Sequence, residues 1–198
     1  MISMKSSIVS RLLLTSVFVF CCRYSSAAAQ SKPAYTAVVS LPRAALSRVP
    51  SPNGKWTLVF ECPDNCAERK LWIEENASHK RKLVKEYDRS LSISWSPNSQ
   101  LFFVNDESGS TETRCYVYGV TSLKETDLTK LVLDGDPDAA DFLYSGHSYL
   151  AAKRWVNSSE LLVVLEGQND GMPPRGFTVR YRINLNGSVR KLYQRVEP

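Results

Sequence analysis

The chain has 198 residues and a formal net charge of +5, from 25 basic and 20 acidic side chains. Three basic residues, Lys5, Arg11 and Arg23, lie in an amino-terminal segment without acidic residues, so the other 22 basic and 20 acidic side chains give +2. This near-neutral balance argues against nucleic-acid binding, which requires a concentrated basic surface.

Residues 1–29 have the three-part pattern of a secretory signal peptide. A basic start is followed by an apolar run, residues 12–22, and then by small residues, with Ala27 and Ala29 at the −3 and −1 positions of a cleavage before Gln30. A transmembrane helix needs about 20 apolar residues, and this run is shorter. We therefore expect a periplasmic or secreted chain without a transmembrane anchor after processing.

Three cysteines remain after this segment: Cys62, Cys66 and Cys115. Exported proteins lie in compartments where disulfides form. The short separation of Cys62 and Cys66 makes them the candidate pair, with Cys115 as a buried thiol. A zinc site is disfavoured, because neither histidine has ligand-like spacing to these cysteines.

Residues 30–47 are predicted as a linker or a first edge strand, and residues 48–198 as a domain of short strands. Aromatic and β-branched runs alternate with turn-forming Pro, Asn, Gly and Ser, which predicts a sandwich, a barrel or a propeller. Helix is predicted only near residues 124–133 and 138–144. The expected strands are 56–60, 71–73, 82–84, 90–95, 101–104, 115–120, 161–165 and 177–183.

Three segments share one pattern of a strand end, a tight polar turn and an apolar strand. They are residues 50–60, 95–104 and 155–164, and they begin 45 and 60 residues apart. A four-stranded propeller blade repeats about every 40–45 residues, so the longer interval indicates an insertion, residues 134–146. Leu91, Ile93 and Trp95 alternate and should point to one covered face.

The segment Trp95-Ser96-Pro97-Asn98-Ser99 resembles the TolB-like and WD40-like propeller repeats of bacterial envelope proteins, whose hallmark is Trp-Ser-Pro-Asp-Gly. Asn98 stands where Asp is usual, and Ser99 replaces Gly. The resemblance implies an all-β, propeller-like domain with about three blades in an open or incomplete propeller; a β-sandwich is the alternative. Because the family members are mostly binding modules, it also implies a protein or peptide partner in the cell envelope.

The segment 146–150, Gly-His-Ser-Tyr-Leu, is similar to the nucleophile elbow Gly-x-Ser-x-Gly. Leu150 replaces the last glycine, which the elbow needs for close packing of strand and helix. The only histidine besides His147 is His79. We therefore expect an ordinary loop before a strand, and a secreted hydrolase using Ser148 is the alternative function.

Asp134, Asp136 and Asp138 occupy positions one, three and five of a calcium-loop pattern. Ala139 and Ser145 stand where such a loop requires glycine and a bidentate glutamate. We expect an acidic surface insertion and no cofactor, with calcium as the alternative.

A set of aromatic residues could be core residues or could line a carbohydrate or peptide groove. They are Tyr116, Tyr118, Trp155, Tyr181 and Tyr193. Because no cluster fits a reaction, the sequence favours a non-catalytic binding module and no catalytic residue. A carbohydrate-binding or structural envelope protein is a further alternative.

Overall fold

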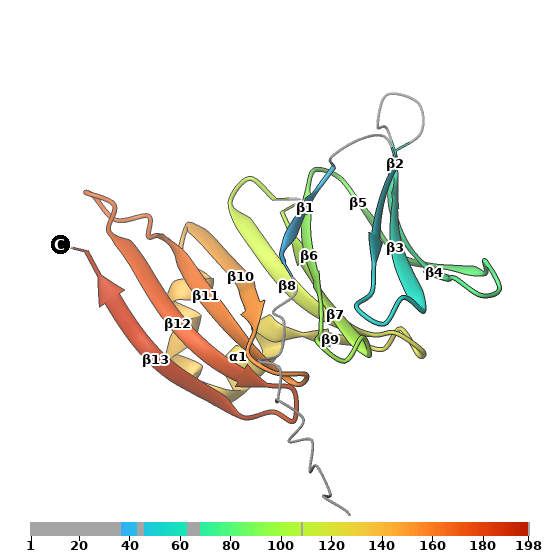
Figure 1. Cartoon of the computed structure of the whole chain (residues 1–198). Coiled ribbons are helices and arrows are strands. Elements are labelled where there is room, and N and C mark those ends of the chain that lie inside the picture. Colours follow the sequence, from blue (N-terminus) through green and yellow to red (C-terminus); the bar gives the residue numbers. More distant parts are fainter. Residues whose placement is uncertain (1–36, 43–45, 63–67, 108, 198) are drawn as a thin grey trace, which may run out of the picture. The chain divides into compact units, whose positions relative to one another are not determined.

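The computed structural model describes most of one compact unit, Lys32–Pro198 (Figure 1). The predicted signal peptide and Cys66 lie outside the described residues. Those residues are 37–42, 46–62, 68–107 and 109–197.

Strands dominate the described part of the chain, and the helices are short. The helical elements are α1 (Leu128–Gly135), the 3₁₀ turn η2 (Pro137–Ala139) and α2 (Ala140–Leu143). The strands are β1 (Val39–Leu41), β2 (Leu46–Pro50), β3 (Trp56–Glu61), β4 (Arg69–Glu75), β5 (Arg81–Tyr87), β6 (Leu91–Trp95), β7 (Leu101–Asp106), β8 (Glu112–Gly119), β9 (Glu125–Asp127), β10 (His147–Trp155), β11 (Glu160–Gln168), β12 (Gly176–Asn184) and β13 (Val189–Val196).

The strands form three antiparallel units, which we call blades. The first blade is β2-β3-β4-β5, the second is β6-β7-β8-β9 with β1 beside β6, and the third is β10-β11-β12-β13. A short parallel pairing, Glu112 with Ser148 and Thr113 with Tyr149, joins the second and third blades. The domain is therefore all-β and propeller-like with open sheets, as the sequence predicts.

The segment before the predicted domain start contributes to both the first and second blades. β1 pairs antiparallel with β6, Val39 opposite Ile93 and Leu41 opposite Leu91. β2 begins at Leu46, so the boundary expected at residue 48 falls inside a strand. The described part of residues 30–47 therefore contains edge strands.

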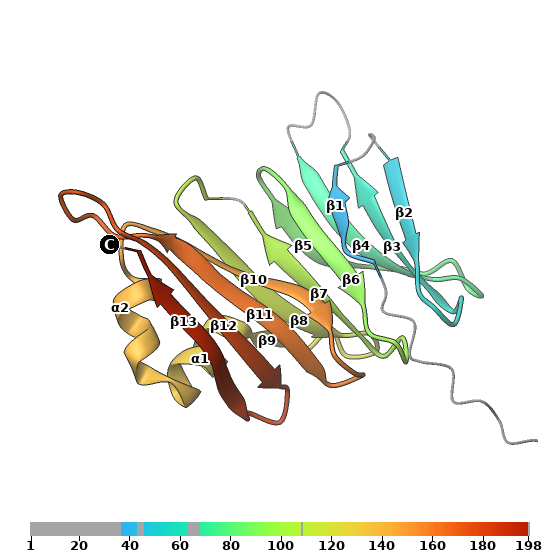
Figure 2. The same ribbon diagram turned by 60° about the vertical axis from the view of Figure 1, so that its left-hand side comes forward.

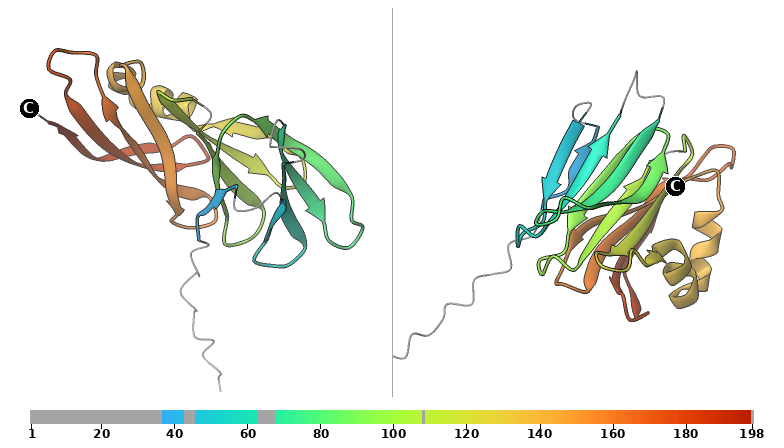
Figure 3. Two further views of the ribbon diagram at one scale, coloured as in Figure 1. Left: turned by 90° about the horizontal axis from the view of Figure 1, so that it is seen from above. Right: turned by 90° about the vertical axis from the view of Figure 1, so that its right-hand side faces the viewer.

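The second blade is covered on both faces. All five residues of β6 are buried, and Leu91, Ile93 and Trp95 pack in one cluster with apolar side chains of the first blade. On the opposite face, Phe103 and Cys115 pack with the third blade. The first and third blades stand on either side of the second (Figure 3). The prediction that Leu91, Ile93 and Trp95 share a covered face is confirmed.

The two best copies of the repeated turn have the same hydrogen bonds. Ser51 Oγ donates to Asn53 Oδ1 at 2.9 Å, and Ser96 Oγ donates to Asn98 Oδ1 at 2.8 Å. Gly54 and Ser99 both have positive φ, +68° and +61°. Glycine adopts this conformation without steric cost, so Ser99 holds the same turn with a less suitable residue.

Tryptophan side chains repeat the same contact at both junctions between blades. Trp95 Nε1 donates to the carbonyl of Val49 at 3.1 Å, and Trp155 Nε1 donates to the carbonyl of Ser94 at 3.2 Å. Val49 and Ser94 each precede the aligned position in their own repeat. The aligned segments are therefore structural repeats, and an indole ties the second and the third each to the preceding one.

The first helix begins later than the sequence indicates, at Leu128 and not near residue 124. Glu125–Asp127 forms β9 against β8, and the Asp127 carboxylate accepts a hydrogen bond from Thr129 N at 2.8 Å, which caps α1. Leu128 and Val132 of α1 are fully buried against the third blade. α1 and α2 lie on one face of that blade (Figure 2). Within the described ranges, no helix is long and apolar enough to cross a membrane.

Candidate functional site

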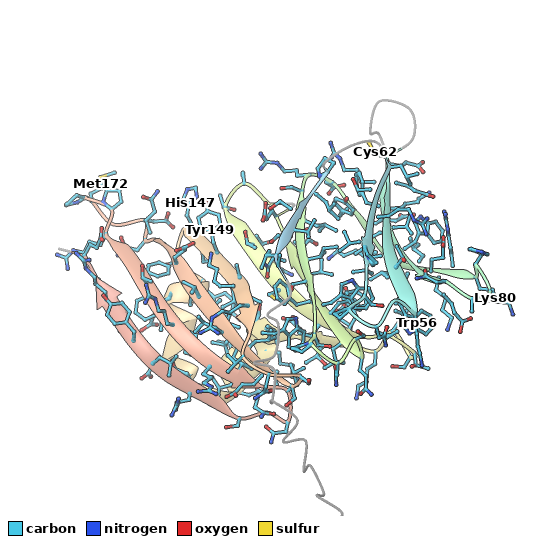
Figure 4. The ribbon with its side chains drawn as sticks, in the orientation of Figure 1. Trp56, Cys62, Lys80, His147, Tyr149 and Met172 are labelled. Carbon is cyan, nitrogen blue, oxygen red and sulfur yellow. The ribbon has the colours of Figure 1, made fainter. Side chains whose placement is uncertain are left out.

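Ser148 is not at a nucleophile elbow. It lies within β10, paired with Gly167 of β11, and its hydroxyl donates to the carbonyl of Leu143 at 2.9 Å. His147, the adjacent strand residue, faces the opposite side with Tyr149, whose hydroxyl is 3.2 Å from His147 Nδ1 (Figure 4). The geometry gives Ser148 a structural hydrogen bond and places neither histidine beside it.

A cavity of about 400 Å³ opens between β8, α1, α2 and β10. Ser148 and Asp134 both line this cavity, together with Lys130 and Tyr144. Opposite charges are mixed in this lining. The cavity therefore gathers two of the sequence candidates without arranging a base beside the serine.

The acidic insertion is used for packing. Asp136 Oδ2 accepts hydrogen bonds from the Tyr181 hydroxyl at 2.9 Å and from Lys191 Nζ at 2.7 Å. Across the described residues, no group of three or more His, Cys, Asp or Glu side chains could hold a metal ion. The calcium-loop interpretation of Asp134, Asp136 and Asp138 thus gains no support, since Asp136 joins the insertion to the third blade.

Most of the aromatic candidates are core residues. Trp155 and Tyr181 are fully buried, and Tyr118 is 3% exposed and stacks on Phe102 at 5.5 Å between ring centroids. Burial raises the pKa of Tyr181 above its usual value. Tyr193 differs, since it is 43% exposed on β13. The alternative that Tyr118, Trp155 and Tyr181 line a binding groove is therefore wrong.

The cysteines have different environments. Cys62 is disulfide-bonded, and because Cys66 lies outside the described residues, the pairing of these two cysteines stays a prediction. Cys115 is a free, fully buried thiol, and its burial raises its pKa to about 12. A thiol held in this protonated form is a packing group.

The first blade has one face that packs on the second blade and one that points away from it. Across the outward face, one row of directly opposite residues runs Arg48, Val59, Trp72 and Leu83. In Figure 1 no described segment covers this side of β2–β5. We call it the outer face of the first blade.

Polar groups of this outer face are only partly satisfied. The Glu74 carboxylate, whose side chain is 4% exposed, accepts from Arg48 at 2.5 Å and from Arg81 at 2.6 Å. These hydrogen bonds lower the pKa of Glu74 to about 2. The indole nitrogen of Trp72, in contrast, is buried and has no acceptor in the described structure. Buried donors without partners are uncommon in folded proteins.

The charges of this outer face balance. Three basic residues, Arg48, Lys70 and Arg81, share it with three acidic ones. The acidic residues are Glu61, Glu74 and Glu86. A neutral face with a central tryptophan and the exposed Leu83 is suited to a protein surface of mixed polarity.

The outward face of the third blade, opposite the helices, is basic. Its six basic side chains, which we call the basic face, are Lys153, Arg154, Arg180, Arg182, Arg190 and Arg195. Its acidic side chains are Glu160, Glu166 and, just beyond β13, Glu197. The two outward faces of the domain therefore differ in charge.

Sequence comparisons give no relative, and structure comparisons give distant ones. No protein-family model matches the chain, and no curated protein matches it at a significant level. Among solved structures, it is similar to the beta-propeller domain of the Trilobed protease from Pyrococcus furiosus, with 14% identity and a TM-score of 0.49 over 75% of this chain and 43% of that one. It is also similar to an acylaminoacyl peptidase from Pyrococcus horikoshii, with 14% identity and a TM-score of 0.44 over 75% and 25%.

The chain thus spans less than half the length of either solved chain. At this level of identity and TM-score the likeness carries no argument about activity. The propeller-like assignment rests on the strand order, the repeated turns and the two indole contacts described above.

Proposed function

We propose that this chain is an exported, non-catalytic binding module that holds a protein partner in the cell envelope through the outer face of its first blade. The observation that carries the proposal is the buried indole N–H of Trp72, which has no acceptor in the described structure on a face that no described segment covers. A partner whose docking moved the side chains over this N–H and that supplied a carbonyl or carboxylate would satisfy this donor.

The surroundings of Trp72 have the composition of an interaction centre. Tryptophan and arginine dominate the binding energy of protein interfaces, and Trp72 lies in the same row as Arg48. Leu83, directly opposite Trp72, is 41% exposed, and Leu46 is 55% exposed. A partner covering this face would bury these apolar side chains around the donor.

Export and envelope location rest on residues 1–29 and on the resemblance of the segment 95–99 to TolB-like repeats. The absence of catalysis is an expectation that the placement of Ser148 supports, because its hydroxyl donates to Leu143. Either a peptide or a folded domain would offer an acceptor to the Trp72 indole N–H. We therefore describe the partner by its chemistry: a hydrogen-bond acceptor for Trp72 and a surface of mixed charge.

Site-specific photo-crosslinking in cells that export the chain tests the proposal. A photoreactive residue at Leu83 should give one discrete adduct, which Trp72→Ala removes and Trp72→Phe weakens. The same residue at Met172, which is fully exposed in the hairpin between β11 and β12, is the matched control and should not give that adduct. An adduct unchanged in Trp72→Ala, or no adduct at Leu83, overturns the proposal.

A further inference from the structure

The basic face of the third blade has more positive charge than the near-neutral composition leads one to expect. Six basic side chains meet three acidic ones on this single surface. Five of the six are arginines. Their positions follow strand alternation, since the opposite face of the same strands carries the buried core residues Val163, Val179 and Ile183.

Part of this charge is already neutralised within the face. Arg182 binds Glu160 through two nitrogens, at 2.6 and 2.8 Å, and Lys153 lies 3.3 Å from Glu166. The double contact shows that an arginine here can hold a carboxylate with both arms of its guanidinium group. The contact between Arg182 and Glu160 is therefore an example, within the protein, of how other arginines of this face would bind a carboxylate.

Two arginines of the face form no close ion pair with a carboxylate, although the charge of Arg190, after the hydrogen bonds from Arg182, helps to lower the pKa of Glu160. Among the described residues, neither Arg180 nor Arg190 has an ion pair, and both are exposed. Arg180 lies over the ring of Tyr193, 5.4 Å from its centroid, which supports the guanidinium from one side. Arg190 is directly opposite Arg182 on the neighbouring strand.

We infer that the basic face binds an extended acidic peptide segment of a partner protein. Arg180 and Arg182 stand two residues apart on β12, which separates same-face side chains by roughly 6.6 Å. Alternate side chains of an extended peptide have the same spacing. Glutamate or aspartate at every second position would therefore face Arg180 and, by displacing Glu160, Arg182. Tyr193, directly opposite Arg180, would add an apolar contact beside it.

The acidic residues of the face favour a peptide over a continuous polyanion. Glu160 and Glu166 stand among the arginines, at both ends of β11. They would repel a phosphate backbone or a uniformly anionic lipid surface, whereas carboxylates placed at intervals avoid them. Arginine, with its planar fork, also suits paired recognition of carboxylates better than lysine does.

Fluorescence anisotropy with a labelled decapeptide carrying glutamate at alternate positions tests this inference. Binding should be measurable, should weaken as salt rises from about 50 to 300 mM, and should fall about tenfold in the double variant Arg180→Glu/Arg190→Glu. Lys80→Glu reverses one charge, half the change of the double variant, in an exposed turn of the first blade and should change binding less than about twofold. Trp72→Ala should also leave peptide binding unchanged, which separates this site from the proposed protein-binding face.

Three outcomes overturn the inference. A peptide that does not bind marks the face as solvated surface, and binding insensitive to the double variant places the site elsewhere. Equal or tighter binding of a single-stranded oligonucleotide or of anionic phospholipid vesicles marks a general polyanion surface. Overlapping thermal melts of the variants and the wild type show that folding is retained, and Arg180→Gln/Arg190→Gln repeats the measurement with a milder change.

Discussion

Two tryptophans of neighbouring blades illustrate the difference between a closed and an open surface. Trp95 of the second blade is 2% exposed, and its indole donates to the carbonyl of Val49. Trp72 of the first blade also has a buried indole nitrogen, but no acceptor meets it in the described structure. Burial alone therefore does not distinguish a core residue from an interface residue. These two tryptophans differ in whether the buried indole nitrogen has a hydrogen-bond acceptor.

The comparison can be tested most directly by truncating each tryptophan. Trp95→Ala should lower the free energy of unfolding by about 3–5 kcal/mol, because it empties a packed junction and removes a satisfied donor. Trp72→Ala should lower it by about 1 kcal/mol, the common cost of a substitution outside a closed core. Chemical denaturation of both variants measures the difference. Equal losses would show that the outer face of the first blade is as closed as the junction.

The junction between the second and third blades depends on a buried amide. Asn105 is 3% exposed; its Oδ1 accepts from Ala152 N at 2.8 Å, and its Nδ2 donates to Ala152 O at 3.0 Å. Asn105→Ala should therefore cost about 2–6 kcal/mol, since two buried main-chain groups lose their partner at roughly 1–3 kcal/mol each.

Ser92→Ala is the matched control for Asn105→Ala. It removes only the hydrogen bond that Asn105 Nδ2 donates to Ser92 Oγ at 2.9 Å, and it should cost about 1 kcal/mol. Thermal or urea unfolding compares the two variants. A control as damaging as Asn105→Ala would mean that the serine contact, and not the link to Ala152, holds the junction.

The smallest expected effect concerns the pH dependence of the outer face of the first blade. Hydrogen bonds from Arg48 and Arg81 lower the pKa of Glu74 from 4.5 to about 2, so its stabilising contribution is fully present above pH 4.5 and is lost as the pH falls towards 2. Glu74→Gln should be less stable than the wild type at neutral pH, and the two should converge near pH 2. Urea unfolding at several pH values measures this, and parallel curves would contradict the assigned ion pairs.

Local patterns in the sequence predict the parts of the fold that depend on neighbouring residues. The Ser-Pro-Asn turn before β7 and the alternation of Leu91, Ile93 and Trp95 are both found in the structure. The first two repeats could also be aligned, because both turns have Ser-Pro-Asn at the same spacing, and the third aligns more weakly through Trp155 and the apolar strand after its polar turn.

Contacts between remote segments could not be predicted in this way. Asp136 fits a calcium-loop pattern locally, yet its carboxylate binds Tyr181 and Lys191 from another part of the chain. Ser148 fits an elbow locally, yet strand pairing with β11 determines its orientation. The state of Trp72 depends on which blade face remains uncovered, and this follows only from the assembled sheets.

The indole contacts also give the array of blades a direction. At each junction the later repeat contributes a tryptophan side chain, and the earlier repeat contributes only a main-chain carbonyl, that of Val49 or Ser94. A carbonyl is present at every residue, so the sequence requirement falls on the incoming repeat alone. Pro50 occupies the tryptophan position in the first repeat. A duplicated gene segment that carries its own tryptophan would therefore extend such an array downstream without altering existing repeats. An upstream addition would also require tryptophan in place of Pro50.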